Sequence, residues 1–299
     1  MRHAAGWRAG TGYLARGLAI TRPHVGVQLR ILGVFVLPAL AAAYLAAIAV
    51  ARQPALWEQA LHAVLPWVTA VLGTVVVMVA VRYEARDRRI GLRGATLRAL
   101  PWVPRYFWTN VHTTVIFWVP MGILLQLRTL QQDLAPIDGP LEPVVWVLWW
   151  VPIGVLGLFL HTRTLLAAFL AIHGDQPATL AALEAWRLSG RDFGRCLGTL
   201  LAGTIPVGLP LALAAGLLAL TLSGWWLATF TAAVPDLLWA GIQAVRPVLI
   251  PAIYMLYRDL WDPEVERRRR EGAPPLPAFA RALLRLTRPL PHPGRLSPL

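Results

Sequence analysis

The strongest candidate for chemistry in this chain is an arginine in the middle of an apolar stretch. Arg246 stands near the centre of residues 237–257, with Gln243 one helical turn before it. A guanidinium at that depth in a bilayer costs about 2.5–3.5 kcal/mol, so it is expected to face the protein interior and find a partner. No Asp or Glu lies at a matching depth. Two hypotheses stay open: a phosphate or carboxylate site in a hydrated cavity, or an arginine bonded by carbonyls that Pro247 and Pro251 free.

His161 and Arg163 form a second polar group near the end of the apolar residues 144–164. A histidine can relay protons or bind a metal, but no second ligand stands at a metal-binding spacing from it. The long side chain of Arg163 can reach the headgroup level of a bilayer. We expect both residues to lie at the membrane interface. The candidate ligands for an anion are Arg246, Gln243 and Arg163.

The sequence contains none of the motifs that identify common enzymes. It lacks the His-Glu-x-x-His metalloprotease motif, the Gly-x-Ser-x-Gly nucleophile motif and a Gly-rich phosphate loop that ends in lysine. Its single cysteine, Cys196, excludes an intramolecular disulfide and a cysteine-built metal site. The carboxylates between Asp259 and Glu266 stand beside a run of arginines, so salt bridges are expected there in place of a metal. We predict no catalytic residue, metal or cofactor.

The elements that must hold these residues are six apolar stretches. Of the 299 residues, 57% are hydrophobic and 14% are charged, against about 25% charged residues in soluble chains. A helix needs about 20 apolar residues to cross the hydrocarbon core. The expected fold class is therefore an all-α membrane protein with six transmembrane helices. They lie near residues 31–51, 63–81, 109–127, 144–164, 197–222 and 237–257.

The distribution of arginine predicts the orientation. All 28 basic residues are arginines, of which 24 fall on one side of the six stretches and 2 on the other. Basic residues concentrate on the cytoplasmic side of membrane proteins. We therefore expect a multi-pass protein of the bacterial inner (plasma) membrane with both termini in the cytoplasm. Arg98 and Arg105, in the loop 82–108, are expected to contact lipid headgroups.

The net charge of +13 suggests a polyanionic partner. A nucleic-acid binder carries its charge on a folded polar surface with groups that read or stack on bases. Here the arginines cluster beside apolar stretches, which favours the anionic headgroups of membrane lipids over nucleic acid. A protein partner or a homo-oligomer is compatible with the same pattern.

A short segment recurs at a fixed offset. Ala95–Leu100 resembles Ala178–Leu183, 83 residues later, and the same offset aligns the flanking apolar stretches. Fainter copies stand at Arg16–Leu18 and Ala278–Leu283. The pattern predicts a repeated unit, in which an amphipathic cytoplasmic helix is followed by a helical hairpin that goes out and back. Three such units give the six spans.

The carboxy-terminal tail carries the clearest amphipathic pattern. Between residues 276 and 290, apolar side chains recur at spacings of three and four, with Arg281, Arg285 and Arg288 on the opposite face. A basic amphipathic helix of this kind lies in the plane of the membrane interface, or packs on another protein or on the loops. The expected regions are a cytoplasmic segment with an interfacial helix (1–30), a six-span domain (31–261) and a basic cytoplasmic tail (262–299).

The loops resemble those of a family of bacterial integral membrane proteins. Arg163, Ala178 and the segment Leu183-Glu184-Ala185-Trp186-Arg187-Leu188-Ser189-Gly190 are similar to the family's apolar-Arg and Trp-Arg-Leu stretch. Tyr257-Arg258-Asp259-Leu260, Arg270-Glu271-Gly272 and Leu14-Ala15-Arg16-Gly17-Leu18 resemble its exit from the last span and its initial surface helix. The family is related to the membrane domain of glycerophosphoryl diester phosphodiesterase, and the resemblance implies six spans. It implies no hydrolase activity, because no phosphodiesterase domain is attached, and Trp261 to Arg269 interrupts the ending.

The leading hypothesis is a non-enzymatic inner-membrane protein that engages anionic lipids, with a role in envelope or lipid homeostasis or as the partner subunit of another membrane protein. The alternative is a transporter of a small solute or anion with a cavity around Arg246, because repeats and kinked helices occur in transporters. A membrane-embedded enzyme ranks third, because no acid–base pair shares one depth. A water-filled cavity that reaches Arg246 would favour transport, and a solid core with a lipid-facing groove would favour the first hypothesis.

Overall fold

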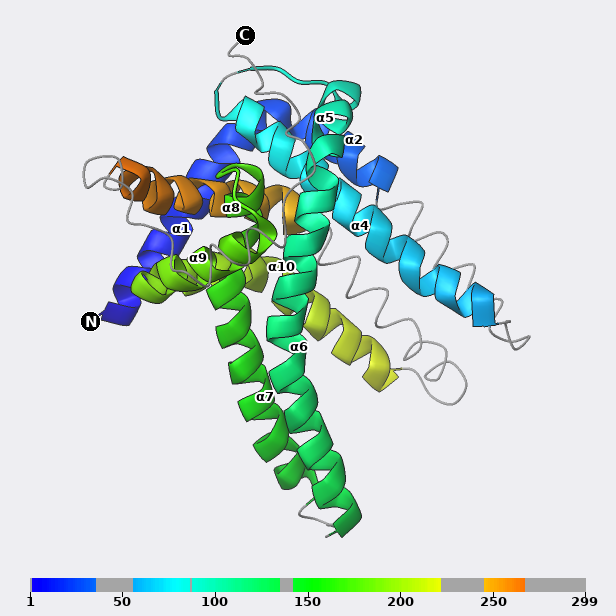
Figure 1. The fold of residues 1–299 in the computed structure, drawn as a ribbon. Helices are drawn as coiled ribbons and strands as arrows, with labels where there is room; N and C mark the ends of the chain where they lie inside the picture. Colours follow the sequence, from blue (N-terminus) through cyan, green and yellow to red (C-terminus); the bar gives the residue numbers. More distant parts are fainter. Residues whose placement is uncertain (1, 36–55, 87, 135–141, 222–244, 267–299) are drawn as a thin grey trace. The chain divides into compact units, whose positions relative to one another are not determined.

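The computed structural model describes residues 2–35, 56–86, 88–134, 142–221 and 245–266. This part of the chain is almost entirely helical and contains no strand (Figure 1). It divides into two compact units, one with residues from Met1–Pro104 and Leu197–Ala273, the other with residues from Arg105–Cys196. The predicted all-α class is confirmed for the described residues.

The described part of the chain contains helices of very different lengths. The elements are α1 (Arg2–Thr21), the 3-10 turn η1 (Arg22–His24), α2 (Val25–Phe35), α4 (Leu56–Glu84), α5 (Leu92–Ala99), the 3-10 turn η3 (Leu100–Trp102), α6 (Val103–Leu134), α7 (Glu142–Thr164), α8 (Ala167–Ile172), α9 (Ala178–Arg191), α10 (Phe193–Thr221) and a helix over residues 245–266. A short helix, a break and a long helix follow one another twice, as α5–η3–α6 and α9–α10. The predicted repeat also requires two spans after each short helix, and because the span near 237–257 begins outside the described residues, the repeat stays a prediction.

The first unit is built around α4. From Val75 to Val81 every side chain of this helix is at most 4% exposed. A helix that is apolar on all sides needs neighbours on all sides, and α1, α2 and α5 all pack against α4. The unit therefore has a continuous apolar core, to which Ile31 of α2 and Leu256 of the helix over 245–266 also contribute buried side chains.

Helix α1 approaches two other helices of the first unit at very short range. A Cβ atom on Gly10 would overlap the backbone of Gly198 in α10. A Cβ atom on Gly17 would lie 2.6 Å from the backbone nitrogen of Ala252. Glycine is the one residue type that allows backbones to come this close. Arg16, on the same helix, forms an ion pair with Asp259 at 2.7 Å.

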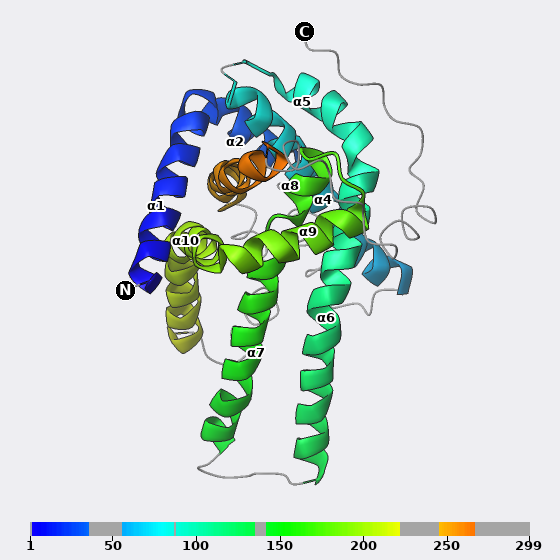
Figure 2. The same ribbon diagram turned by 60° about the vertical axis from the view of Figure 1, so that its left-hand side comes forward.

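Helices α6 and α7 form a long hairpin in the second unit (Figure 2). Near its tip, the indole nitrogen of Trp149 donates a hydrogen bond to Gln131 at 3.2 Å. Nearer its base, a Cβ atom on Gly157 would touch the ring of Phe117 at 3.5 Å, so the two helices are in contact there. Helix α9 packs on α7 and α8, and in both views it runs across the base of the hairpin.

Among the described residues, two helices are long and apolar enough to cross a membrane, by length and composition: Leu92–Gln131, which includes most of α6, and Val151–Ile172, in α7 and α8. Only 6% of the most apolar window of the first is buried inside the protein, against 56% for the second. The exposed apolar side chains of the hairpin include Val115, Trp118, Val119, Ile123, Leu127 and Leu130 of α6, and Leu148, Val151 and Val155 of α7. Exposed apolar side chains in such number mark a candidate surface for a membrane or for another protein.

The predicted spans near 109–127 and 144–164 fall on these two helices. Those near 63–81 and 197–222 fall on α4 and α10, whose side chains are described in part. Outside the described residues lie most of the span near 31–51, the beginning of the span near 237–257, Gln243, and the tail helix near 276–290 with Arg281, Arg285 and Arg288. The six-span arrangement and the cytoplasmic placement of both termini stay predictions.

Candidate functional site

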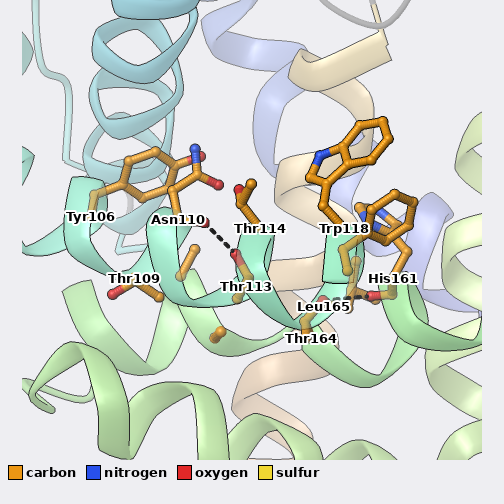
Figure 3. A pocket seen from close by; sticks show the side chains of 12 residues that line it. Tyr106, Thr109, Asn110, Thr113, Thr114, Trp118, His161, Thr164 and Leu165 are labelled. Carbon is orange, nitrogen blue, oxygen red and sulfur yellow. Dashed lines mark hydrogen bonds between the residues drawn. The ribbon is translucent and has the colours of Figure 1, made fainter. Parts of the chain in front are cut away.

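A cavity of about 290 Å³ lies in the second unit, between α6 and the junction of α7 with α8 (Figure 3). Helix α6 presents Tyr106, Thr109, Asn110, Thr113, Thr114, Phe117 and Trp118 to it, and the other wall consists of His161, Thr164, Leu165, Ala167 and Ala168. Tyr106 and Asn110 stand at one end of the row, and Trp118 and His161 stand at the other. Among these residues the sequence analysis considered His161 alone.

The threonines of the cavity keep their acceptor capacity. Thr109, Thr113 and Thr164 each donate their hydroxyl proton to a backbone carbonyl three or four residues earlier, at 2.8, 3.0 and 3.1 Å respectively. A hydroxyl has two acceptor lone pairs besides its one proton. These three side chains can therefore accept hydrogen bonds from a molecule in the cavity without giving up the bonds that hold them.

Three other polar side chains of the lining have no hydrogen bond to any residue that the structure describes. They are Tyr106, Asn110 and Thr114, and each of them can donate as well as accept. Tyr106 is 9% exposed as a whole residue. The lining contains no Asp, Glu or Arg. The cavity thus offers donors and acceptors to a ligand but no fixed charge.

Arg246 is bonded to the backbone of a neighbouring helix in the first unit. Its Nη1 donates to the carbonyl oxygen of Ala70 in α4 at 2.7 Å, and the Thr74 hydroxyl donates to the same oxygen at 2.7 Å. The partner is therefore a carbonyl, as one of the two hypotheses expected, although it belongs to α4 and is not one that Pro247 or Pro251 frees. The cavity described above is lined by residues of the second unit, and Arg246 is not among them.

Arg163, the second candidate anion ligand, packs between α7 and α9. Its guanidinium lies 4.5 Å from the centre of the Trp186 ring and 5.7 Å from that of Phe159. The Ser189 hydroxyl donates to the Arg163 carbonyl at 2.8 Å, and a Cβ atom on Gly190 would overlap the guanidinium. Cation–π contact with two rings gives this arginine a packing role in the Trp-Arg-Leu-Ser-Gly segment.

The two arginines expected at the lipid interface differ in their surroundings. Arg105 forms an ion pair with Asp175 and donates to the Ala171 carbonyl at 3.4 Å, and its side chain is 17% exposed. Arg98 is exposed and lies over the Tyr83 ring, 4.8 Å from its centre. Arg98 is therefore accessible to a headgroup, whereas Arg105 mainly fixes the start of α6 to the turn after α8.

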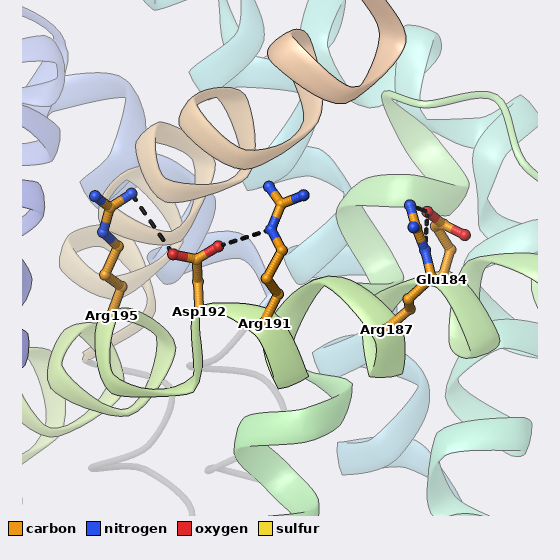
Figure 4. A network of polar contacts seen from close by, with 5 residues as sticks. All are labelled: Glu184, Arg187, Arg191, Asp192 and Arg195. Carbon is orange, nitrogen blue, oxygen red and sulfur yellow. Dashed lines mark hydrogen bonds and ion pairs between the residues drawn. The ribbon is translucent and has the colours of Figure 1, made fainter. Parts of the chain in front are cut away.

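A basic edge lies on α9 and the first turn of α10 in the second unit (Figure 4). Arg187 pairs with Glu184 at 2.6 Å, and Arg191 and Arg195 lie 3.3 and 3.8 Å from the carboxylate of Asp192. The three arginine side chains are between 48% and 57% exposed. Three guanidinium groups and two carboxylates leave this edge with one net positive charge.

Glu84 is a functional candidate that the sequence analysis missed. The Gln28 amide donates to both of its carboxylate oxygens at 3.1 Å, and the two side chains are 3% and 2% exposed. Burial raises the pKa of Glu84 to about 7, and the hydrogen bond from Gln28 offsets part of that effect. No pattern in the sequence links the two residues, because 56 positions separate them. Glu84 stands three residues beyond the predicted span 63–81.

The described residues contain no group of three or more His, Cys, Asp or Glu side chains that could hold a metal ion. The thiol of Cys196 is buried and unpaired. Comparisons with protein-family models, with curated proteins and with solved structures found no match.

Proposed function

We propose that this chain is a non-enzymatic integral protein of the bacterial inner membrane that engages anionic lipids through the basic edge of α9. In this proposal the α6–α7 hairpin crosses the bilayer, and the protein acts in envelope or lipid homeostasis or as the partner subunit of another membrane protein. The observation that carries the proposal is the course of α9 across the base of an apolar hairpin, with Arg187, Arg191 and Arg195 exposed.

The geometry supports this proposal in two steps. If the hairpin spans the bilayer, a helix that crosses its base lies in the plane of the interface, at the level of the lipid phosphates. Each arginine near an anionic surface contributes roughly 1 kcal/mol to the attraction. The arginines of the ion pairs with Glu184 and Asp192 are about half exposed, and pairs of exposed groups are worth about 0–1 kcal/mol each, so lipid phosphates can compete with the carboxylates.

The alternative, a transporter with its cavity around Arg246, has less support. The hydrogen bond from Arg246 to the Ala70 carbonyl supplies the partner that a charge in an apolar helix requires. An anionic substrate is then no longer needed to explain the residue. The proposed membership of the six-span family rests on the resemblance of the loops alone.

The proposal is tested by the lipids that copurify with the protein in mild detergent. We expect the wild type to be enriched in anionic lipids relative to the membrane from which it is extracted. The triple variant Arg187→Gln, Arg191→Gln, Arg195→Gln removes three positive charges from the basic edge of α9 and the first turn of α10. Its anionic lipid content should fall about tenfold if each arginine contributes near 0.5 kcal/mol or more. Quantitative mass spectrometry of the bound lipids provides the measurement.

The matched control replaces the same three arginines by lysine, which keeps the charge at each position. Because the proposal depends on charge at the interface, the lysine variant should retain most of the anionic lipid. Equal anionic lipid in the wild type and the glutamine variant would contradict the role of α9.

A further inference from the structure

We infer that the cavity between α6 and the α7–α8 junction is a binding site for an uncharged, hydroxyl-rich group, a sugar or another polyol. Its ligand reaches it either as the headgroup of a membrane lipid or as a free molecule. The site is distinct from the basic edge of α9, so the inference goes beyond the proposed function. The observation behind it is that six polar side chains line one cavity of the hairpin.

The hydrogen-bonding capacity of the lining fits hydroxyl groups. Thr109, Thr113 and Thr164 offer acceptor lone pairs, and Tyr106, Asn110 and Thr114 offer donors as well as acceptors. A ligand hydroxyl is itself both a donor and an acceptor, so one polyol can use both classes of side chain at once. An ionised phosphate or carboxylate can only accept hydrogen bonds, so it could not donate one to the acceptor lone pairs of the threonine hydroxyls.

The absence of charge in the lining points the same way. No Asp, Glu or Arg lines the cavity, and an ionised ligand would lose hydration there without gaining a counter-charge. Phe117 and Trp118 supply aromatic faces against which the C–H groups of a sugar ring can pack. A cavity of about 290 Å³ is at the small end of the usual range for ligand sites, which suits a single sugar unit.

The side chains at one end of the cavity lie on the surface of the hairpin. Trp118 is 57% exposed, and it lies on the same helix as the apolar residues Val115 and Val119, which are 54% and 56% exposed. His161, which stands beside Trp118 in Figure 3, is also exposed. A lipid whose acyl chains cover this apolar face could therefore place its headgroup in the cavity. A free sugar could enter from the same side.

Native mass spectrometry in a detergent without a sugar headgroup tests the inference. The probes are a glucosyl diacylglycerol and a phosphatidylethanolamine with the same acyl chains, and methyl glucoside serves as a soluble competitor. We expect the wild type to retain the glucosyl lipid preferentially. The variant Asn110→Leu, Thr114→Val should reduce that retention about tenfold, because each lost hydrogen bond contributes about 0.5–1.5 kcal/mol.

The control variant is Thr129→Val, which changes an exposed threonine of the same helix outside the cavity and should leave retention of the glucosyl lipid unchanged. Thr114→Val alone provides a milder change at an exposed position, with a smaller loss of retention expected. The glutamine variant of the α9 arginines should bind the glucosyl lipid normally, which separates this site from the proposed function.

Competition by methyl glucoside would identify the sugar itself as sufficient, and lack of competition would identify the lipid form as the ligand. Both results support the site, provided that the cavity variants reduce retention. Equal retention of the two lipids by the wild type would overturn the inference. The inference would also be overturned if the wild type, the single variant Thr114→Val and the double variant Asn110→Leu, Thr114→Val all retained the glucosyl lipid equally.

Discussion

At the scale of single residues, the buried pair of Glu84 and Gln28 makes the first unit sensitive to pH. The pKa of Glu84 rises from its ordinary value of 4.5 to about 7 because burial disfavours the charged carboxylate. Between these two values the folded protein binds more protons than the unfolded chain, so its stability falls as the pH rises. The contribution of this group is full below pH 4.5 and is lost as the pH passes through about 7.

Replacing Glu84 by glutamine should remove this dependence. The amide keeps an acceptor for Gln28 and carries no charge, so we expect Glu84→Gln to exceed the wild type in stability by about 3 kcal/mol at pH 8. At pH 4.5 the two proteins should be alike. Thermal unfolding in detergent between pH 4.5 and 8 provides the measurement, with Glu266→Gln, an exposed carboxylate of the same unit, as the control. A glutamine variant that keeps the slope of the wild type would refute this assignment.

The sequence identified charged residues that need partners, but it did not identify the partners. The position of Arg246 in an apolar stretch predicts that its charge needs a partner. The sequence does not identify that partner, because the carbonyl of Ala70 lies 176 positions away and resembles every other backbone carbonyl. The same holds for the cavity. Tyr106, Asn110, Thr113 and Phe117 follow one another at helical spacing on α6, but their partner wall depends on how α6 and α7 align. The helical spacing predicts which residues share one face of α6, but it does not predict which residues of α7 lie opposite them.

At the scale of elements, close helix contacts hold α1 to the rest of the first unit. Gly10 of α1 faces the backbone of Gly198, and no flexible side chain stands between them. The leader of the sequence was predicted to contain a surface helix, and α1 covers that region from Arg2 to Thr21. The packing of α1 requires glycine at Gly10 and Gly17, where backbones approach closely. A pattern of hydrophobic residues does not predict such positions.

We expect Gly10→Ala to force α1 away from α10, because the new methyl group would overlap backbone atoms that cannot rotate away. The loss in stability should be about 1–3 kcal/mol, as for other overpacking substitutions. Gly12→Ala on the same helix is the matched control, because nothing lies within 4 Å of a Cβ atom there. The control should be neutral or stabilising by up to about 1 kcal/mol. Thermal unfolding of the two variants side by side decides the matter, and equal midpoints would be inconsistent with the close contact.

Some elements could be predicted from the sequence and others could not. The recurring segments at 95–100 and 178–183 fall on α5 and α9, where small residues such as Ala99 and Ala182 are buried. Helix α8 was missed, since its six apolar residues directly follow the span near 144–164 and give no separate signal. The break at Leu165 that creates α8 carries neither glycine nor proline.

At the scale of the whole molecule, two units share one chain that the sequence presents as a single six-span domain over residues 31–261. Within this range the described residues group into two compact units, and the first is assembled from separate parts of the chain. Composition predicts that most of the chain is apolar, but it carries no information on which parts of the chain pack together. The sequence predicts apolar spans in the region of the hairpin, and in the structure apolar side chains of α6 and α7 are exposed. These two observations are the basis of the proposed membrane location.

The central claim, that the α6–α7 hairpin crosses a membrane, is tested most directly by labelling single cysteines in spheroplasts. The native Cys196 is first replaced by alanine, and one cysteine is then introduced near the hairpin tip as Thr129→Cys or at its base as Arg187→Cys. With a membrane-impermeant maleimide, the account predicts that Cys at position 129 reacts in intact spheroplasts and Cys at position 187 reacts only after lysis. Equal labelling of the two positions before lysis, or release of the protein from membranes by alkaline carbonate, would contradict it.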